Sequence, residues 1–275
     1  MRVRRNRSIS RRGAEARGNQ AKGLPLRATV PLREIKFLLK FIAAMTALVA
    51  VAGSLRAQSA TDEHLYRQLA LGEKEDAMAA LNQIVKAPEA VSSTVLYSAV
   101  GEAAREKRLE DAGFLFYIAR FRALFDKELF PPVGDAKSSP LTALGALQQQ
   151  WGGAINPAIM GNPRAFELVL ARVKAWTPKA PDGYHPGWEY VAKGSEDQAA
   201  AVMNEGRRQF LETMGGLCTL LQDAMYYTAF RVCQEYNMKR GDDRPSRGVY
   251  NAAMLTLQRI EKERGIPGIA AQSRK

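Results

Sequence analysis

Three glutamates recur at helical spacing and give the sequence its clearest pattern of acids. Glu102, Glu106 and Glu110 stand four residues apart, so a helix would place them on one face. Cleavage of a glycosidic bond needs two carboxyl groups roughly 5 to 9 Å apart, and such a face could supply them. However, basic residues are interleaved with the three acids. We therefore interpret this face as solvated and joined by ion pairs, and we predict no catalytic residue on it.

Other kinds of catalytic or cofactor chemistry lack their usual residues. The chain has two histidines, His64 and His185, and no cysteine pair at the spacing of metal ligands. No glycine-rich phosphate loop occurs, and no Gly-x-Ser-x-Gly turn accompanies His185 to form a serine triad. We therefore predict no metal, no haem, no nucleotide and no other cofactor.

Aromatic residues gather on the longest irregular stretch, residues 177–193, which reads TPKAPDGYHPGWEYVAK. This loop carries Tyr184, His185, Trp188 and Tyr190. Loops often carry function, and these four residues could contact a ligand or a partner. Alternatively, Tyr184 and Trp188 pack the loop onto the helices, as large aromatics on ordered loops usually do. The sequence favours packing and leaves both interpretations open.

The two cysteines, Cys218 and Cys233, form a candidate disulfide. An oxidising compartment would permit the bond. If a turn lies at residues 222–223, however, the two cysteines are offset by roughly 9 Å along their helices, at 1.5 Å per residue. A disulfide needs Cα atoms within about 7 Å, so two small buried hydrophobic residues are the alternative.

The elements that must position these residues are helices. Apolar residues recur at spacings of three and four, and alternation typical of strands is absent, so we predict an all-α bundle of packed antiparallel helical hairpins. The helix over 111–128 is apolar nearly all round and should be the centre of the core. We expect helices at 61–71, 73–86, 88–107, 111–128, 139–151, 162–176, 195–221, 224–236 and 247–264.

Three finer expectations concern breaks, pairing and the C-terminal tail. Gly152-Gly153 and Asn156-Pro157 should divide the chain into short turns after residue 151. The helices over 195–221 and 224–236 should pair antiparallel. The residues from 266 onward should form a loose tail.

One pair of predicted helices, over 95–125, resembles a single helical hairpin of the tetratricopeptide or Sel1-like type. Aromatic, aliphatic and glycine positions of that pattern are occupied by Tyr97, Val100 and Gly101 in the first helix, and the second-helix positions by Asp111-Ala112, Tyr117 and Ala119. Ala104 replaces the usual aromatic residue, and no second copy follows at a fixed period. The resemblance implies a protein-binding scaffold, although a solenoid needs at least about three stacked repeats.

The positive charge of the chain lies in front of the predicted bundle. The whole sequence has 40 basic and 28 acidic residues, a net charge of +12. Residues 1–57 hold 13 of the basic residues and only two of the acidic ones, which leaves 27 and 26 for the remainder. The bundle is therefore nearly neutral, and we predict that it does not bind nucleic acid.

The segment over 35–59 has the order of parts found in a secretory signal peptide. Lys36 and Lys40 precede 15 uncharged residues, 41–55, and small residues follow. Fifteen residues fall short of the roughly 20 that span a membrane, so cleavage is favoured over anchoring. We predict a mature start between Gln58 and Thr61 and an exported protein, periplasmic or secreted. An uncleaved N-terminal anchor and a buried core helix are the alternatives.

Residues 1–34 are rich in arginine, lack apolar periodicity and precede the signal segment. Such a composition does not fold by itself, and we predict a disordered basic extension. A translation start assigned too far upstream would explain it, with the natural start near Val30 or Leu32.

The sequence thus divides into a basic extension (1–34), a signal peptide (35–59), an α-helical domain (60–237) and a C-terminal part (238–275) with a linker, a last helix and a tail. We expect a non-catalytic module that binds another envelope or secreted protein and that meets a membrane only through the signal segment. The alternative is an envelope enzyme or small-ligand binder that uses the loop 177–193. The oligomeric state stays open.

Overall fold

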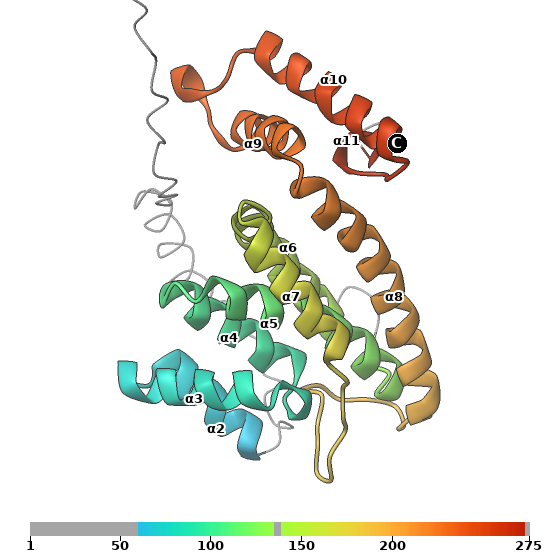
Figure 1. The fold of residues 1–275 in the computed structure, drawn as a ribbon. Helices are drawn as coiled ribbons and strands as arrows, with labels where there is room; N and C mark the ends of the chain where they lie inside the picture. Colours follow the sequence, from blue (N-terminus) through green and yellow to red (C-terminus); the bar gives the residue numbers. More distant parts are fainter. Residues whose placement is uncertain (1–59, 135–138, 273–275) are drawn as a thin grey trace, which may run out of the picture. The chain divides into compact units, whose positions relative to one another are not determined.

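The computed structural model describes residues 60–134 and 139–272, and it confirms the all-α fold (Figure 1). Within these ranges no β-strand occurs, and the one isolated antiparallel bridge joins Pro132 to Tyr190. The predicted extension (1–34) and signal peptide (35–59) lie outside the described residues.

The helices follow one another with short connections. Their bounds are α2 (Ala60–Leu71), α3 (Lys74–Lys86), η2 (Pro88–Ala90), α4 (Ser93–Arg105), α5 (Leu109–Leu129), α6 (Pro140–Met160), α7 (Pro163–Ala175), α8 (Glu196–Leu221), α9 (Ala224–Met238), η3 (Gly241–Asp243), α10 (Arg247–Arg264) and α11 (Ile269–Gln272).

Side-chain caps explain where several helices begin. An oxygen of the capping residue accepts a hydrogen bond from a backbone N–H of the first turn, which would otherwise lack a partner. Such caps stand before α6, α7, α8, α9 and α10, and they are Ser139, Asn162, Ser195, Asp223 and Ser246. The starts predicted at residues 139, 162 and 195 are therefore confirmed to within one residue.

Helix α5 is the centre of the fold, as its apolar circumference predicts. It packs against α4, α6, α7 and α8, so that it is buried on several sides. The aromatic rings of Phe116, Tyr117 and Phe121 lie within this core, and Phe210 of α8 packs on the last two at 4.8 and 5.4 Å between ring centroids.

Helix α6 does not break where the sequence predicts. It continues through Gly152-Gly153 and Pro157 to Met160. The reason is burial, because Trp151, Ile155 and Ile159 recur every four residues and all face the core. A Cβ added to Gly152 would lie 3.3 Å from the ring of Phe116, so this glycine lets α6 approach α5 closely. Tertiary packing here outweighs the local preference of glycine and proline for turns.

The C-terminal helices also pair differently from the prediction. We expected α8 to pair with α9, but α8 packs mainly against α5 and α7, whereas α9 packs mainly against α10 (Figure 1). Helix α10 presents Ala253, Leu257 and Ile260 as its buried stripe. The segment predicted to be a loose tail contains the short helix α11, and Gly268 and Ala270 in it are buried.

Candidate functional site

The aromatic loop 177–193 is held at both ends by backbone hydrogen bonds. Near its start, the N–H of Lys179 donates to the carbonyl of Glu89 (3.3 Å). Near its end, the N–H of Val191 donates to the carbonyl of Pro131, and the N–H of Val133 donates to that of Glu189, both at 3.0 Å. The loop is therefore an ordered part of the fold, fastened to η2 and to the end of α5.

Tyr184 inserts into a buried cluster with Arg122 and Asp126, one turn apart on α5. The hydroxyl of Tyr184 donates to Asp126 Oδ2 (2.6 Å), and Arg122 Nε donates to that hydroxyl oxygen (2.9 Å). Arg122 Nε also lies 2.9 Å from Asp126 Oδ1. Both charged side chains are 0% exposed. The guanidinium carbon stands 4.0 Å from the centre of the Tyr184 ring, so the cation stacks on the aromatic face.

Arg122 extends the cluster to three further segments. Its Nη1 donates to the carbonyl of Glu89 (3.0 Å) and to that of Lys179 (2.5 Å). Asp62 of α2 lies close enough to interact electrostatically with both Arg122 and Asp126, and its Oδ2 accepts the N–H of Ser92 (3.0 Å). One arginine therefore joins α2, η2, α5 and the aromatic loop.

The protonation of this cluster follows from its burial. Loss of solvent raises the pKa of Asp126 to about 6, although Arg122 and Tyr184 act in the opposite direction. Burial and the Asp126 carboxylate raise the pKa of Tyr184 well above its ordinary value. Tyr184 is therefore a neutral hydrogen-bond donor at all physiological pH values, and it serves to position its neighbours.

The other aromatic residues of the loop surround Phe130. Trp188 is 3% exposed, and its indole N–H donates to the carbonyl of Phe130 (2.8 Å). Tyr190 packs edge-on against the Phe130 ring at 4.9 Å between centroids. His185 stands 5.6 Å from the Tyr190 ring, its Nδ1 accepts the N–H of Gly187 (3.1 Å), and burial lowers its pKa. Trp188 is thus buried, whereas Tyr184, His185 and Tyr190 all stay partly exposed, although the Tyr184 hydroxyl reaches the buried ion pair.

Arg122 and Asp126 are site residues that the sequence analysis missed. The signal was present, because a pair of opposite charges four residues apart interrupts a helix that is otherwise apolar nearly all round. A charged pair on such a helix has to be buried with it.

The three glutamates of the acidic face have separate surroundings. Glu102 is buried and pairs with Arg105, and burial, with Glu106 nearby, raises its pKa. Glu106 lies 3.5 Å from Lys74 of α3, and Glu110 lies apart from both at the start of α5. The predicted ion pair with an interleaved base is present for Glu102, whereas Glu106 pairs with a lysine of another helix. The prediction of a solvated face is wrong for Glu102, because α4 turns this residue inward.

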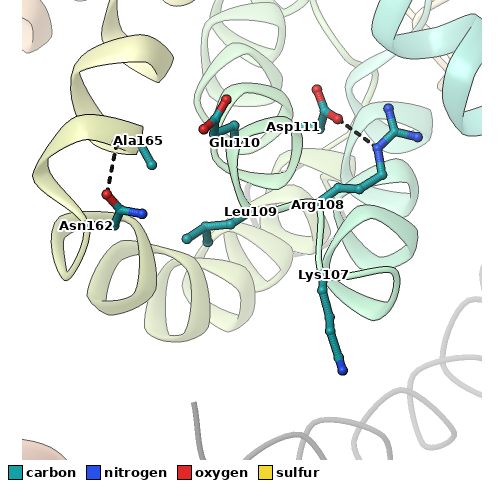
Figure 2. Close-up of a pocket in the computed structure, with 7 residues that line it drawn as sticks. All are labelled: Lys107, Arg108, Leu109, Glu110, Asp111, Asn162 and Ala165. Carbon is teal, nitrogen blue, oxygen red and sulfur yellow. Dashed lines mark hydrogen bonds and ion pairs between the residues drawn. The ribbon is translucent and has the colours of Figure 1, made fainter. Parts of the chain in front are cut away.

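A shallow depression of about 310 Å³ lies where α5 and α7 begin (Figure 2). Asp111 joins two arginines there, at 2.8 Å from Arg108 Nε and 2.9 Å from Arg172 Nη1. Asn162 caps α7 by accepting the N–H of Ala165 (3.2 Å). Figure 2 shows Lys107 extending away from the other lining residues. The ionic groups of this depression hold helix ends together.

A larger depression, of about 840 Å³, lies along the end of α10 and the turn that follows it. We call it the C-terminal groove. Its lining residues include apolar, cationic, amide and acidic side chains, and they are Leu255, Gln258, Arg259, Glu261, Lys262, Gly265, Ile266 and Pro267.

The two cysteines of the candidate disulfide are free in the structure, and both are buried. Cys218 lies near the end of α8, and Cys233 lies in the third turn of α9. Burial raises the pKa of both thiols, which keeps them protonated and unreactive.

Within residues 60–134 and 139–272, no three His, Cys, Asp or Glu residues come together to hold a metal ion. In the same ranges, no helix has the length and apolar character that a membrane span requires. No family model matches the chain, and no curated protein and no solved structure is significantly similar to it. Function therefore has to be inferred from the residues themselves.

Proposed function

We propose that the chain from about residue 60 onward is an exported, non-catalytic module that binds another protein of the envelope or the secreted fraction. The observation that carries the proposal is a contrast between two places. The ion pair of Arg122 and Asp126 is buried and, with the hydroxyl of Tyr184 bonded to it, serves as an internal support. The C-terminal groove is open and leaves apolar side chains in solvent.

Export is proposed from the order of parts in residues 35–59, and the contacts of the first described helix are compatible with it. In α2, the buried carboxylate of Asp62 accepts a hydrogen bond from the backbone N–H of Ser92. Cleavage between Gln58 and Thr61 would leave this contact in place. N-terminal sequencing of the exported protein should find a start within that interval. Recovery of an intact Phe41 in the mature protein would contradict cleavage and favour an anchor.

The interaction role is tested by isolating the tagged full-length protein from envelope extracts of the cells that produce it. We expect a complex of fixed stoichiometry with one protein partner, measured by light scattering and by native mass spectrometry. A monomer that retains a small molecule would contradict the proposal.

The second candidate is a small-ligand binder or enzyme that uses the loop, and one observation favours it. His185 and Tyr190 are partly exposed side by side on an ordered loop, and the lowered pKa of His185 leaves its imidazole neutral near pH 7. A Trp188→Ala protein that folds normally and loses a retained ligand would support this candidate. Loss of folding in that variant would support the packing role.

A further inference from the structure

One wall of the C-terminal groove has a fixed shape. It is formed by residues 265–267, in the turn that follows α10. Helix α10 ends at Arg264 and is capped by Gly265, whose φ of 64° lies in the left-handed region that glycine adopts without strain. Four residues before this cap, Glu261 accepts hydrogen bonds from the hydroxyl of Tyr226 and from the N–H of Ala270, both at 3.0 Å. These contacts tie the turn over 265–268 to α9 and α10.

The turn also depends on the absence of a side chain at Gly268. A Cβ at this position would collide with the Tyr226 hydroxyl and with the Glu261 carboxylate. Ile266 packs close to Gly216 of α8, where an added Cβ would lie 3.0 Å from its Cγ2. The groove is therefore preorganised, which reduces the entropy lost when a partner binds.

The exposed side chains of the groove on α10 are one apolar and two cationic. Leu255 is 66% exposed. Arg259 and Lys262 follow it one and two turns later along the same helix, and both are exposed. The ion pair of Arg259 with Glu263 spans 3.8 Å between two exposed side chains, so it competes only weakly with an incoming anion.

The charge of the chain is polarised toward this end. Residues 60–237 hold 18 basic and 22 acidic residues, a net charge of −4, whereas residues 238–275 hold nine and four, a net charge of +5. The near neutrality of the whole domain therefore conceals a basic C-terminal part. Of the basic residues in this part, Arg259 and Lys262 line the groove, and these two would attract an acidic partner and disfavour a basic one.

We propose that the C-terminal groove binds an acidic segment of a partner protein, with one apolar side chain of that segment resting against Leu255. The carboxylates of the segment would pair with Arg259 and Lys262. This inference rests on the proposed interaction function and names its surface and the chemistry of its partner.

Two other occupants fit the observations less well. A lipid surface would need a wide apolar face, but the apolar stripe of α10, with Leu257 and Ile260, is turned toward α9. A second copy, with its acidic body set on this groove, would make a head-to-tail contact. Such contacts form open filaments unless the rotation closes, so they are selected against in soluble proteins.

The test measures binding of a short fluorescent peptide, in which glutamates flank one leucine, to the purified full-length protein. We expect binding that weakens with added salt, as exposed charges predict. A peptide with Lys for Glu should not bind, and one with Ala for Leu should bind about tenfold more weakly, which corresponds to about 1.4 kcal/mol.

Matched variants locate the site. Lys262→Glu and Leu255→Asp should each weaken binding by about tenfold or more. The controls Lys86→Glu on α3 and Leu71→Asp on α2 change equally exposed residues far along the chain and should leave binding unchanged. Circular dichroism verifies that each variant is folded. Equal effects at both places, or no binding of the acidic peptide, would overturn the proposal.

Three further outcomes would also overturn it. These are stronger binding to phosphatidylglycerol vesicles that depends on Lys262, self-association that Lys262→Glu abolishes in sedimentation, and a photo-crosslinker at position 255 that captures only basic peptides. If Lys262→Glu leaves the cellular complex intact, the groove inference fails while the interaction function stands. If no complex exists, the function fails on its own.

Discussion

The body of the fold and its C-terminal part bury charge in different ways. In the body, Arg122 and Asp126 form an ion pair with both side chains removed from solvent, and Tyr184 bridges them. In the C-terminal part, the carboxylate of Glu261 is held by neutral donors, the Tyr226 hydroxyl and the Ala270 N–H. The first cluster joins four segments from across the sequence, whereas the second shapes one short turn.

The difference shows what each region requires. A loop as long as 177–193 loses much conformational entropy when it is ordered, and a buried ionic centre with many hydrogen bonds offsets that loss. The turn after α10 needs only its direction fixed, and a few neutral hydrogen bonds achieve this. We therefore expect the body to fail globally when its cluster is broken, and the C-terminal part to fail locally.

The largest effect is predicted for Asp126→Ala. This change leaves the Arg122 guanidinium buried without its counter-charge, which typically costs about 3–5 kcal/mol. We expect a loss of that size in the free energy of unfolding, measured by urea denaturation of the exported protein. The matched control is Arg208→Ala, which removes exposed pairs with Glu205 and Glu212 and should cost at most about 1 kcal/mol. Similar losses of unfolding free energy in the two variants would mean that water reaches the Arg122–Asp126 ion pair.

The second prediction concerns pH. The folded-state pKa of Asp126, about 6, lies above its ordinary value of 3.8, so the folded protein binds this proton more tightly than the unfolded chain does. The free energy of unfolding should therefore fall as pH rises from about 4 to about 6, by on the order of 1–3 kcal/mol from this group.

Asp126→Asn should lack this contribution, because an amide does not titrate. Asp62 and Arg122 face the same carboxylate and remain in the variant, so the difference between the two pH profiles isolates Asp126. Urea denaturation at several pH values gives both profiles. Parallel profiles would contradict a raised pKa.

The third prediction probes the turn after α10. Gly268→Ala places a methyl group against Tyr226 and Glu261, and overpacking of this kind costs typically about 1–3 kcal/mol. We expect hydrogen exchange to increase around α11 and the end of α10, with little change in α5. Gly153→Ala is the control, because a Cβ there meets nothing within 4 Å in the middle of α6, and it should stabilise the protein by up to about 1 kcal/mol. Equal exchange throughout would show that the C-terminal part does not open locally.

Sequence patterns predicted the helices well where capping and periodicity agree. The starts of α6, α7 and α8 follow from Ser139, Asn162 and Ser195, since a cap is a local interaction. The passage of α6 through Pro157 was not predictable in this way, because it depends on burial against distant residues. The same limit explains the pairing of α9 with α10, which is a property of the tertiary fold.

The clusters were predictable only in part. That Tyr184 and Trp188 pack inward agrees with the preferred interpretation of the aromatic loop. Their partners, Arg122 and the carbonyl of Phe130, lie 62 and 58 residues away, and no local pattern joins them. The sequence did not predict the C-terminal groove. The net charge of the whole helical domain is close to zero and does not reveal that its C-terminal part is the more basic one.

The smallest predicted effect concerns the joint between the two regions, where Cys218 lies near the end of α8 and Cys233 lies on α9. Both thiols are free and buried, so replacing either cysteine by alanine should lower the free energy of unfolding by about 1 kcal/mol, the usual size of a modest change in the core. The two losses should add if the thiols do not touch.

A disulfide predicts otherwise, because either single change would break the bond and the second would then cost little. Urea denaturation of both single variants and the double variant therefore distinguishes the two states, and titration of denatured, unreduced protein should find two reactive thiols. Non-additive losses with no titratable thiol would show that the two cysteines form a disulfide in the exported protein.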